Sequence, residues 1–214
     1  MSLALLLRRS VAPVLGCLPL AAAFAQQPPA SPSPPAAQAA PAAEVQQPVV
    51  PVSASAQRLF ERTRAQLVQV RTLLKGQASQ ASVGSAFVVT PQGHLITNYH
   101  VVSQVALQPE RYRLVYTAAD GREGPLELLA FDAIHDLALV RAGDGGLDGR
   151  TPLKFRPAGK QLAKGERIYS LGNPLDVGFA VLEGNYNGLV ERSFYPNIFF
   201  AGALNPGMSG GPAL

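Results

Sequence analysis

The stretch GSAFVVTPQGHLITNYHVV, residues 84–102, gives the first indication of the fold class of this chain. Two runs of apolar and β-branched residues flank the turn residues PQG at positions 91–93, which is typical of two short strands joined by a turn. We therefore predict strands over residues 83–90 and 94–102. His100 then lies at the end of the second strand.

Similar β-type runs recur on both sides of this stretch. They are LVQVRTLL (67–74), YRLVYTA (112–118), LELLAFDA (126–133), LALVRA (137–142), RIYSLG (167–172), FAVLEGNYNGLV (179–190) and IFFAG (198–202). Strands this close together, without intervening helices of about 10 to 15 residues, argue for an all-β antiparallel barrel or sandwich. One short helix is expected at residues 54–65, with Leu59 and Phe60 on its apolar side and Ser53 as its N-cap.

The N-terminal residues differ in composition from the rest of the chain. Residues 1–25 carry two arginines, then an apolar stretch, and end on Ala-Phe-Ala, which is typical of a signal peptide cleaved after Ala25. Two prolines interrupt the apolar stretch, which argues against the alternative of a membrane anchor, since a spanning helix needs about 18 unbroken apolar residues. Cys17 leaves lipidation of this leader open. Residues 26–53, rich in Pro, Ala and Gln, predict a disordered tether, so the globular domain is expected at residues 54–214.

Charge and cysteine content exclude several kinds of partner. The formal net charge of +4 includes the two leader arginines, and no basic run or basic–aromatic alternation indicates nucleic acid. Cys17 is the single cysteine and lies in the leader, so the mature chain has neither a disulfide framework nor a thiolate metal site. We expect no metal or cofactor and no stable membrane insertion after leader cleavage. The sequence leaves the oligomeric state open.

Three positions suggest nucleophilic catalysis. His100 follows an apolar run, Asp136 opens DLALVRA, and Ser209 lies among the glycines of NPGMSGGPAL (205–214). A serine hydroxyl is a poor nucleophile near neutral pH unless an imidazole takes its proton and a carboxylate orients that imidazole. Each residue alone has an ordinary structural interpretation. His94 and His135 are interpreted only as turn-adjacent and strand-edge residues.

These residues lie in motifs that resemble those of trypsin-like serine peptidases. TNYHVV is similar to the histidine motif of that family, HDLALV to its aspartate motif and GMSGGP to its nucleophile motif, in the family's order. Within this family, the chain most resembles the bacterial HtrA branch. The resemblance lies in the segments GSAFVVTPQGHLITNYHVV, LGNPLDVGFAVLEG and ALNPGMSGGPAL. The resemblance covers roughly residues 66–214 and implies a double antiparallel β-barrel with the active site between its halves.

The resemblance also implies roles for the residues around Ser209. The backbone N–H groups of Gly207 and Ser209 would form an oxyanion hole, and Met208 replaces the Asn or Asp usual at its position. Ala203, Leu204 and Asn205 would line part of the primary specificity pocket. They include no acid, so an apolar, small-to-medium side chain is expected before the cleaved bond.

The implied function is that of a serine endopeptidase acting on exported or envelope polypeptides, in the periplasm or secreted. Because the family's second barrel continues for several strands beyond the nucleophile, we expect a fragment or a prematurely ended chain with an incomplete second barrel. The alternative function is therefore a catalytically inactive remnant or a protein-binding module with the same fold.

Overall fold

The computed structural model describes residues 52–143, 145–157, 159–190 and 196–214. All of the described residues lie in one compact unit of the chain. The predicted signal peptide and nearly all of the predicted tether lie outside the described residues. Within the described part of the chain, no helix is both long enough and apolar enough to cross a membrane.

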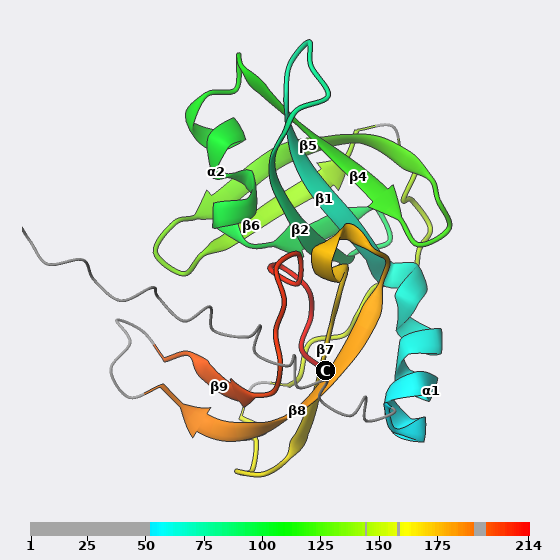
Figure 1. Cartoon of the computed structure of the whole chain (residues 1–214), viewed down its shortest axis with the longest axis vertical. Helices are drawn as coiled ribbons and strands as arrows, with labels where there is room; N and C mark the ends of the chain where they lie inside the picture. Colours follow the sequence, from blue (N-terminus) through cyan, green and yellow to red (C-terminus); the bar gives the residue numbers. More distant parts are fainter. Residues whose placement is uncertain (1–51, 144, 158, 191–195) are drawn as a thin grey trace, which may run out of the picture. The chain divides into compact units, whose positions relative to one another are not determined.

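Six strands form a closed antiparallel barrel in the order β1-β2-β3-β6-β5-β4, drawn in the upper part of Figure 1. They are β1 (Leu67–Leu74), β2 (Gln80–Val88), β3 (His94–Thr97), β4 (Tyr112–Ala118), β5 (Glu123–Asp132) and β6 (Leu137–Ala142). The register shifts between Leu128 and Ala130 in β5, and between Thr72 and Leu73 in β1. Such irregularities bend strands and help a sheet to close on itself.

The barrel interior is a continuous apolar core. Val70, Val88, Leu95 and Val140 are completely buried there, and Tyr116 is 1% exposed. β1 is buried along most of its length because one face lines the barrel while Leu67, on the other, packs against a second apolar cluster. This explains why apolar residues occur on both faces of β1, although polar residues interrupt its sequence LVQVRTLL.

A second sheet has the order β7-β8-β9 and lies below the barrel in Figure 1. Its strands are β7 (Arg167–Gly172), β8 (Ala180–Leu189) and β9 (Ile198–Ala201), and the short 3-10 helix η2 (Pro174–Asp176) lies between the first two. β7 contacts β1 and β2, so this sheet packs against the barrel. The prediction of an all-β fold with an antiparallel barrel is confirmed.

The predicted N-terminal helix is confirmed as α1 (Ala54–Thr63), which continues into the 3-10 helix η1 (Arg64–Gln66). The Ser53 hydroxyl accepts a hydrogen bond from the Ala56 N–H at 3.2 Å, as expected of an N-cap. Leu59 and Phe60 pack against the second apolar cluster, which includes Leu171 and Val181. α1 thus covers apolar residues of β7 and β8, and Figure 1 shows it alongside β8.

One strand prediction is wrong in a way that matters for the site. The strand expected over residues 94–102 ends at Thr97, and residues Tyr99–Leu107 form the helix α2. Val101 and Val102 are buried, and Val105 packs against the barrel core, a spacing that matches one face of a helix. His100 therefore lies in the first turn of a helix, not at the end of a strand.

An ion-pair cluster on the barrel gives a prediction about stability. Hydrogen bonds from Arg122, together with the nearby Arg150, lower the pKa of Asp120 from 3.8 to about 2. A carboxylate with a lowered pKa stabilises the fold above its unfolded pKa, and this stabilisation is lost as the pH falls from about 4 towards 2. Because Asp120 is 44% exposed, we expect Asp120→Asn to lower the free energy of unfolding by at most about 1 kcal/mol at pH 6.

Urea titrations of both proteins between pH 6 and pH 2.5 measure this difference. The difference should shrink at the acidic end, because Asp120 becomes protonated in the unfolded chain, at its ordinary pKa, before it does so in the folded protein. A gap that stays constant over this pH range would contradict the electrostatic explanation.

Candidate active site

His100 and Asp136 are in direct contact, although 36 residues separate them in the chain. The His100 Nδ1 lies 2.7 Å from Asp136 Oδ2, and the His100 backbone N–H donates to Asp136 Oδ1 at 2.8 Å. Because an ionised carboxylate only accepts hydrogen bonds, the Nδ1 must carry the proton. In neutral His100 the Nε2 is then left as the free acceptor. The two side chains are 55% and 38% exposed, so the imidazole is open to an approaching molecule.

Asp136 is held in an uncommon backbone conformation just before β6. Its φ angle is +55°, in the left-handed region that a non-glycine residue enters at a cost of about 1 kcal/mol. The Asp136 carbonyl accepts a hydrogen bond from Asn98 Nδ2 at 2.7 Å. Asn98 is also the N-cap residue of α2, yet its side chain makes no capping bond. The segment that carries His100 therefore binds both the side chain and the main chain of Asp136.

The barrel also fixes the start of α2. The buried Thr72 hydroxyl of β1 donates to the Val101 carbonyl at 2.8 Å. A Cβ atom at Gly84 would lie 2.6 Å from Val101 Cγ2 and 2.9 Å from the Ser209 carbonyl oxygen. Only glycine fits where α2 and the serine-bearing turn both approach β2, so Gly84 allows His100 and Ser209 to come near one another.

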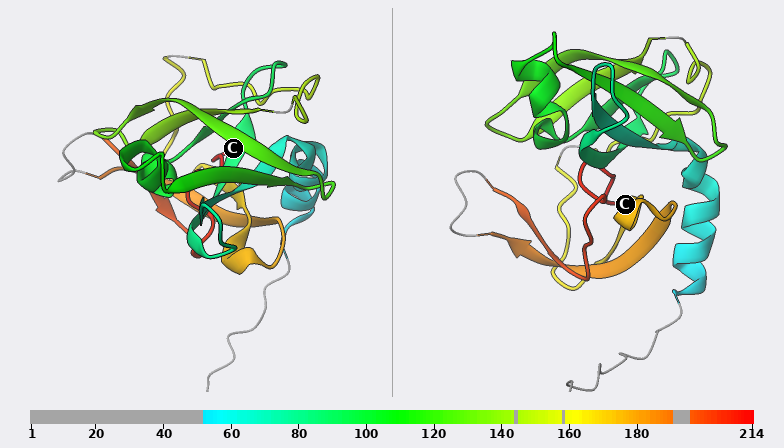
Figure 2. Two further views of the ribbon diagram at one scale, coloured as in Figure 1. Left: turned by 90° about the horizontal axis from the view of Figure 1, so that it is seen from above. Right: turned by 45° about the horizontal axis from the view of Figure 1, so that its top comes forward.

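The glycine-rich turn, residues 205–211, docks onto this same part of the barrel. The Ser85 N–H of β2 donates to the Ser209 carbonyl at 2.7 Å. Gly210 has a φ angle of +84°, and a Cβ atom there would collide with the Ser85 carbonyl and with Thr97 Oγ1, two residues before the helix of His100. After the turn the chain pairs with β7, where Leu171 N–H donates to the Pro212 carbonyl at 3.1 Å. Figure 2 shows this red segment rising from the second sheet to the barrel.

Two backbone N–H groups in the turn have fixed directions. The Pro206 carbonyl accepts from Leu175 N–H at 2.8 Å, and the Met208 carbonyl accepts from Gly211 N–H at 3.0 Å. In a trans peptide the N–H points opposite to the carbonyl, so these bonds orient the N–H groups of Gly207 and Ser209. Among the described residues, neither of these two N–H groups donates to a protein acceptor. They are free to bind a developing negative charge.

The serine and histidine segments also line one hollow, but their side chains are not hydrogen-bonded. Its lining includes Thr97, Asn98 and Leu137 together with Gly210 and Gly211. In the described part of the chain, no hydrogen bond joins the Ser209 hydroxyl to the His100 ring. Catalytic contacts of this kind are commonly loose without substrate and tighten when it binds.

The residues before Ser209 differ in their surroundings. Ala203, Leu204 and Asn205 follow β9 and are exposed, with Leu204 58% exposed. Met208 is buried, with its sulfur close to Gly172 at the end of β7. The apolar Met208 side chain therefore anchors the turn to the second sheet, a position in which a carboxylate would lose its hydration.

The other two histidines make local contacts. His94 Nδ1 lies 2.7 Å from the Thr90 hydroxyl, beside the β2–β3 turn. His135 Nδ1 lies 2.6 Å from Asp132 Oδ2 at the end of the β5–β6 hairpin, and both side chains are about half exposed. Among the described residues, no group of three His, Cys, Asp or Glu side chains is placed to hold a metal ion.

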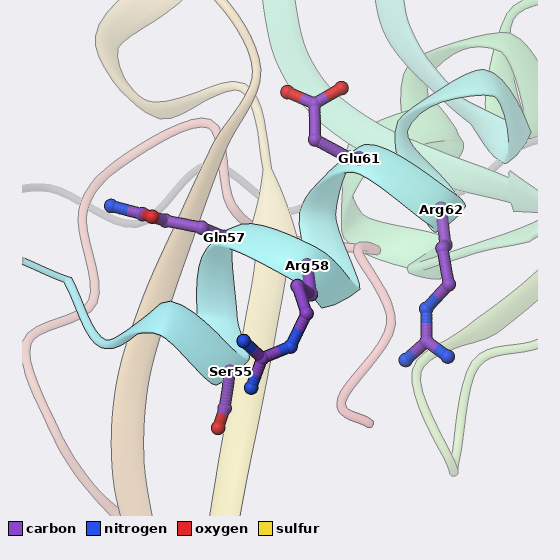
Figure 3. Close-up of a pocket in the computed structure, with 5 residues that line it drawn as sticks. All are labelled: Ser55, Gln57, Arg58, Glu61 and Arg62. Carbon is purple, nitrogen blue, oxygen red and sulfur yellow. The ribbon is translucent and has the colours of Figure 1, made fainter.

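A further hollow lies beside α1 (Figure 3), lined by Ser55, Gln57, Arg58, Glu61 and Arg62. The figure shows Glu61 and Arg62 pointing to opposite sides of the helix. None of these residues belongs to the segments that carry His100, Asp136 or Ser209. We therefore assign the candidate active site to the region where α2, the start of β6 and the glycine-rich turn meet.

Sequence reasoning missed Asn98 and Ser85 as parts of this site. Asn98 could have been found as a helix N-cap, because the spacing of Val101, Val102 and Val105 that follows it is helical. Ser85 offered no comparable signal, since its partners lie in segments distant in the sequence.

Comparisons with known proteins agree with this geometry. The family model described as "Trypsin-like peptidase domain" matches residues 84–214, more than half of the chain. The chain is 31% identical over 142 residues to "Protease Do-like 1, chloroplastic" of Arabidopsis thaliana, a match that covers 61% of this chain and 30% of that protein. It is 30% identical over 145 residues to a "Probable periplasmic serine endoprotease DegP-like" of Chlamydia pneumoniae, covering 65% and 28%. The matched region thus spans about 30% of the length of these relatives.

Solved structures give the same result for the fold. The crystal structure of Deg5 is similar with a TM-score of 0.63 at 25% identity, covering 74% of this chain and 78% of that one. A serine endoprotease from Yersinia pestis shares the fold, with a TM-score of 0.59 at 21% identity, covering 77% and 54%.

Proposed function

Since the chain belongs to the trypsin-like peptidase family, in the branch of its HtrA and DegP-like relatives, we propose that it acts as a serine endopeptidase. Ser209 is the nucleophile, His100 the general base and Asp136 the carboxylate that orients it. The observation that carries this assignment is the double contact of Asp136 with the ring and the backbone N–H of His100. It leaves the His100 Nε2 free to accept a proton.

The proposed reaction follows from this arrangement. The Ser209 hydroxyl attacks the peptide carbonyl while His100 Nε2 takes its proton, and Asp136 stabilises the charged imidazole. The negative charge on the former carbonyl oxygen is bound by the N–H groups of Gly207 and Ser209. His100 then returns the proton to the leaving amine, which gives an acyl-enzyme on Ser209. Water, deprotonated by His100, hydrolyses this ester and restores the serine.

Substrate and location form part of the proposal. The leader at residues 1–25 and relatives named as periplasmic endoproteases support action on exported polypeptides in the cell envelope or outside the cell. Ala203, Leu204 and Asn205 form part of the pocket for the residue before the cleaved bond. Because these residues carry no charge, the pocket favours an apolar side chain of small to medium size.

Degradation of an unfolded model protein tests this function. The wild-type protein is incubated with reduced and alkylated albumin, and mass spectrometry maps the peptides that are released. We expect cleavage mainly after apolar residues, and His100→Ala should slow it by at least about 10⁴, because loss of the base costs no less than loss of the carboxylate that orients it.

Three results would count against the proposal. Binding of the unfolded protein without cleavage would favour a non-catalytic binding module. Cleavage that is equally fast in His100→Ala would assign the activity to another site or to a contaminant. Cleavage after charged residues would overturn the pocket assignment alone.

A further inference from the structure

Ser85 in β2 connects three parts of the molecule through hydrogen bonds. Its side chain and main chain are completely buried. The backbone N–H donates to the Ser209 carbonyl at 2.7 Å, and the backbone carbonyl accepts from Thr97 Oγ1 at 2.7 Å. The hydroxyl donates to the Gly207 carbonyl at 2.7 Å and accepts from the Asn173 N–H at 2.9 Å.

We propose that Ser85 is a positioning residue that sets the geometry of the oxyanion hole through its hydroxyl, an inference that rests on the proposed peptidase function. A serine hydroxyl has a single proton. Because the Asn173 N–H, just after β7, occupies one lone pair of the oxygen, that proton is directed to the Gly207 carbonyl. The hydroxyl thus links the end of β7 to the glycine-rich turn.

The hydrogen bond from the Ser85 hydroxyl to the Gly207 carbonyl lies where it can control the direction of both oxyanion donors. The two proposed oxyanion donors belong to the peptide units 206–207 and 208–209, and a single peptide unit, 207–208, lies between them. The relative direction of the two N–H groups depends on how this middle unit is rotated. Its carbonyl is held by the Ser85 hydroxyl, and its N–H, from Met208, donates to the Asn205 carbonyl at 3.2 Å.

Gly207 makes the turn sensitive to the loss of this bond. Its φ angle is +92°, and glycine has more accessible backbone conformations than any other residue. Without the hydroxyl, the 207–208 unit keeps only the longer bond from Met208. Rotation at Gly207 would then strain the bonds at the Pro206 and Met208 carbonyls, which orient the two donors. The Gly207 carbonyl and the Asn173 N–H would also be left buried without this partner.

Ser85→Ala tests the proposal because it keeps the backbone bond to Ser209 and removes the hydroxyl alone. We expect kcat for peptide hydrolysis to fall by about 10-fold to 100-fold, because the donors act on charge that develops in the transition state. KM should change by less than about threefold, since substrate binding does not depend on these donors. Thr63→Val is the matched control: the Thr63 hydroxyl is mostly buried and donates to the Leu59 carbonyl at 2.8 Å, away from the turn.

Hydrogen–deuterium exchange supplies a readout that does not need activity. The N–H groups of Met208 and Gly211 are hydrogen-bonded within the turn, so Ser85→Ala should speed their exchange. Exchange in β1, which belongs to the barrel core, should stay unchanged. If Ser85→Ala fails to fold, Ser85→Cys provides the same comparison, because a thiol is only a weak donor.

The kcat measurement and the exchange measurement together distinguish failure of the positioning role from failure of the proposed function. If the wild type is active, an unchanged kcat in the variant overturns the positioning role, and so does an equal rise of exchange in β1 and in the turn. If the wild type is inactive, the proposed function fails by itself. Faster exchange confined to the turn then still supports Ser85 as the residue that orders it, whereas unchanged exchange overturns both proposals.

Discussion

Ser209→Ala is expected to lower kcat for peptide hydrolysis by about 10⁶, the effect typical of removing the nucleophile of such a triad. Ser209 is the residue with a hydroxyl in the glycine-rich turn, residues 205–211, and its own N–H is one of the two free N–H groups there. The substitution removes one oxygen and leaves the bond from the Ser85 N–H to the carbonyl at position 209 in place, so the fold should be retained. Hydrolysis of a fluorogenic peptide by the purified proteins measures the effect.

Ser55→Ala provides a control for this measurement. Ser55 is exposed on α1 and is distant in sequence from every segment of the candidate site. Its replacement should leave kcat within about twofold, as expected for a surface substitution. Residual hydrolysis by Ser209→Ala at more than about one hundredth of the wild-type rate would mean that Ser209 is not the nucleophile.

Asp136→Asn should lower kcat by about 10⁴. We expect this loss because the substitution changes the tautomer of His100, while the fold is retained. The backbone N–H of His100 donates to Oδ1 of Asp136, so an asparagine would place its carbonyl oxygen there. Its NH₂ group would then face the His100 Nδ1, which would have to accept instead of donate. The Nε2 would carry the proton and could not take one from Ser209.

The chain contains a matched control for this substitution. Asp132 contacts His135 with the same geometry, since Oδ2 lies 2.6 Å from Nδ1 and Oδ1 accepts from the backbone N–H at 3.0 Å. Asp132→Asn therefore makes the same chemical change in an equivalent pair. We expect kcat to stay within about twofold of the wild type. If both substitutions lowered kcat equally, the effect of Asp136→Asn would reflect general disturbance of the β5–β6 hairpin.

Much of the fold follows from short sequence patterns. β1, β4, β6 and β7 begin and end at the residues predicted from their apolar runs, because turn residues bound each run closely. β2 and β5 begin three residues before their predicted runs. The largest difference is α2, where TNYHVV continues the apolar run of β3 and conceals a change from strand to helix. For short apolar runs, periodicity alone does not distinguish a strand from a buried helix.

Less of the candidate site than of the fold could be predicted from the sequence. The motifs around His100, Asp136 and Ser209 indicated which residues to consider, and the structure brings the first two into contact. The catalytic roles of the three residues stay predictions. The contribution of Ser85 could not be predicted, because its hydroxyl bonds to a carbonyl 122 residues away. Such a contact depends on how the turn packs against β2, and no local pattern encodes that packing.

Mapping the adduct of a fluorophosphonate probe tests the central claim most directly. Such probes form a covalent bond with an activated serine, because the reaction needs both a general base and an oxyanion hole. The wild-type protein, His100→Ala and Ser209→Ala are treated with the probe, digested and analysed by mass spectrometry. We predict one adduct, on Ser209, in the wild type, a labelling rate lower by about 10² to 10⁴ in His100→Ala, and no adduct in Ser209→Ala. An adduct on another residue, or equal labelling of Ser209 with and without His100, would contradict the assignment of this site.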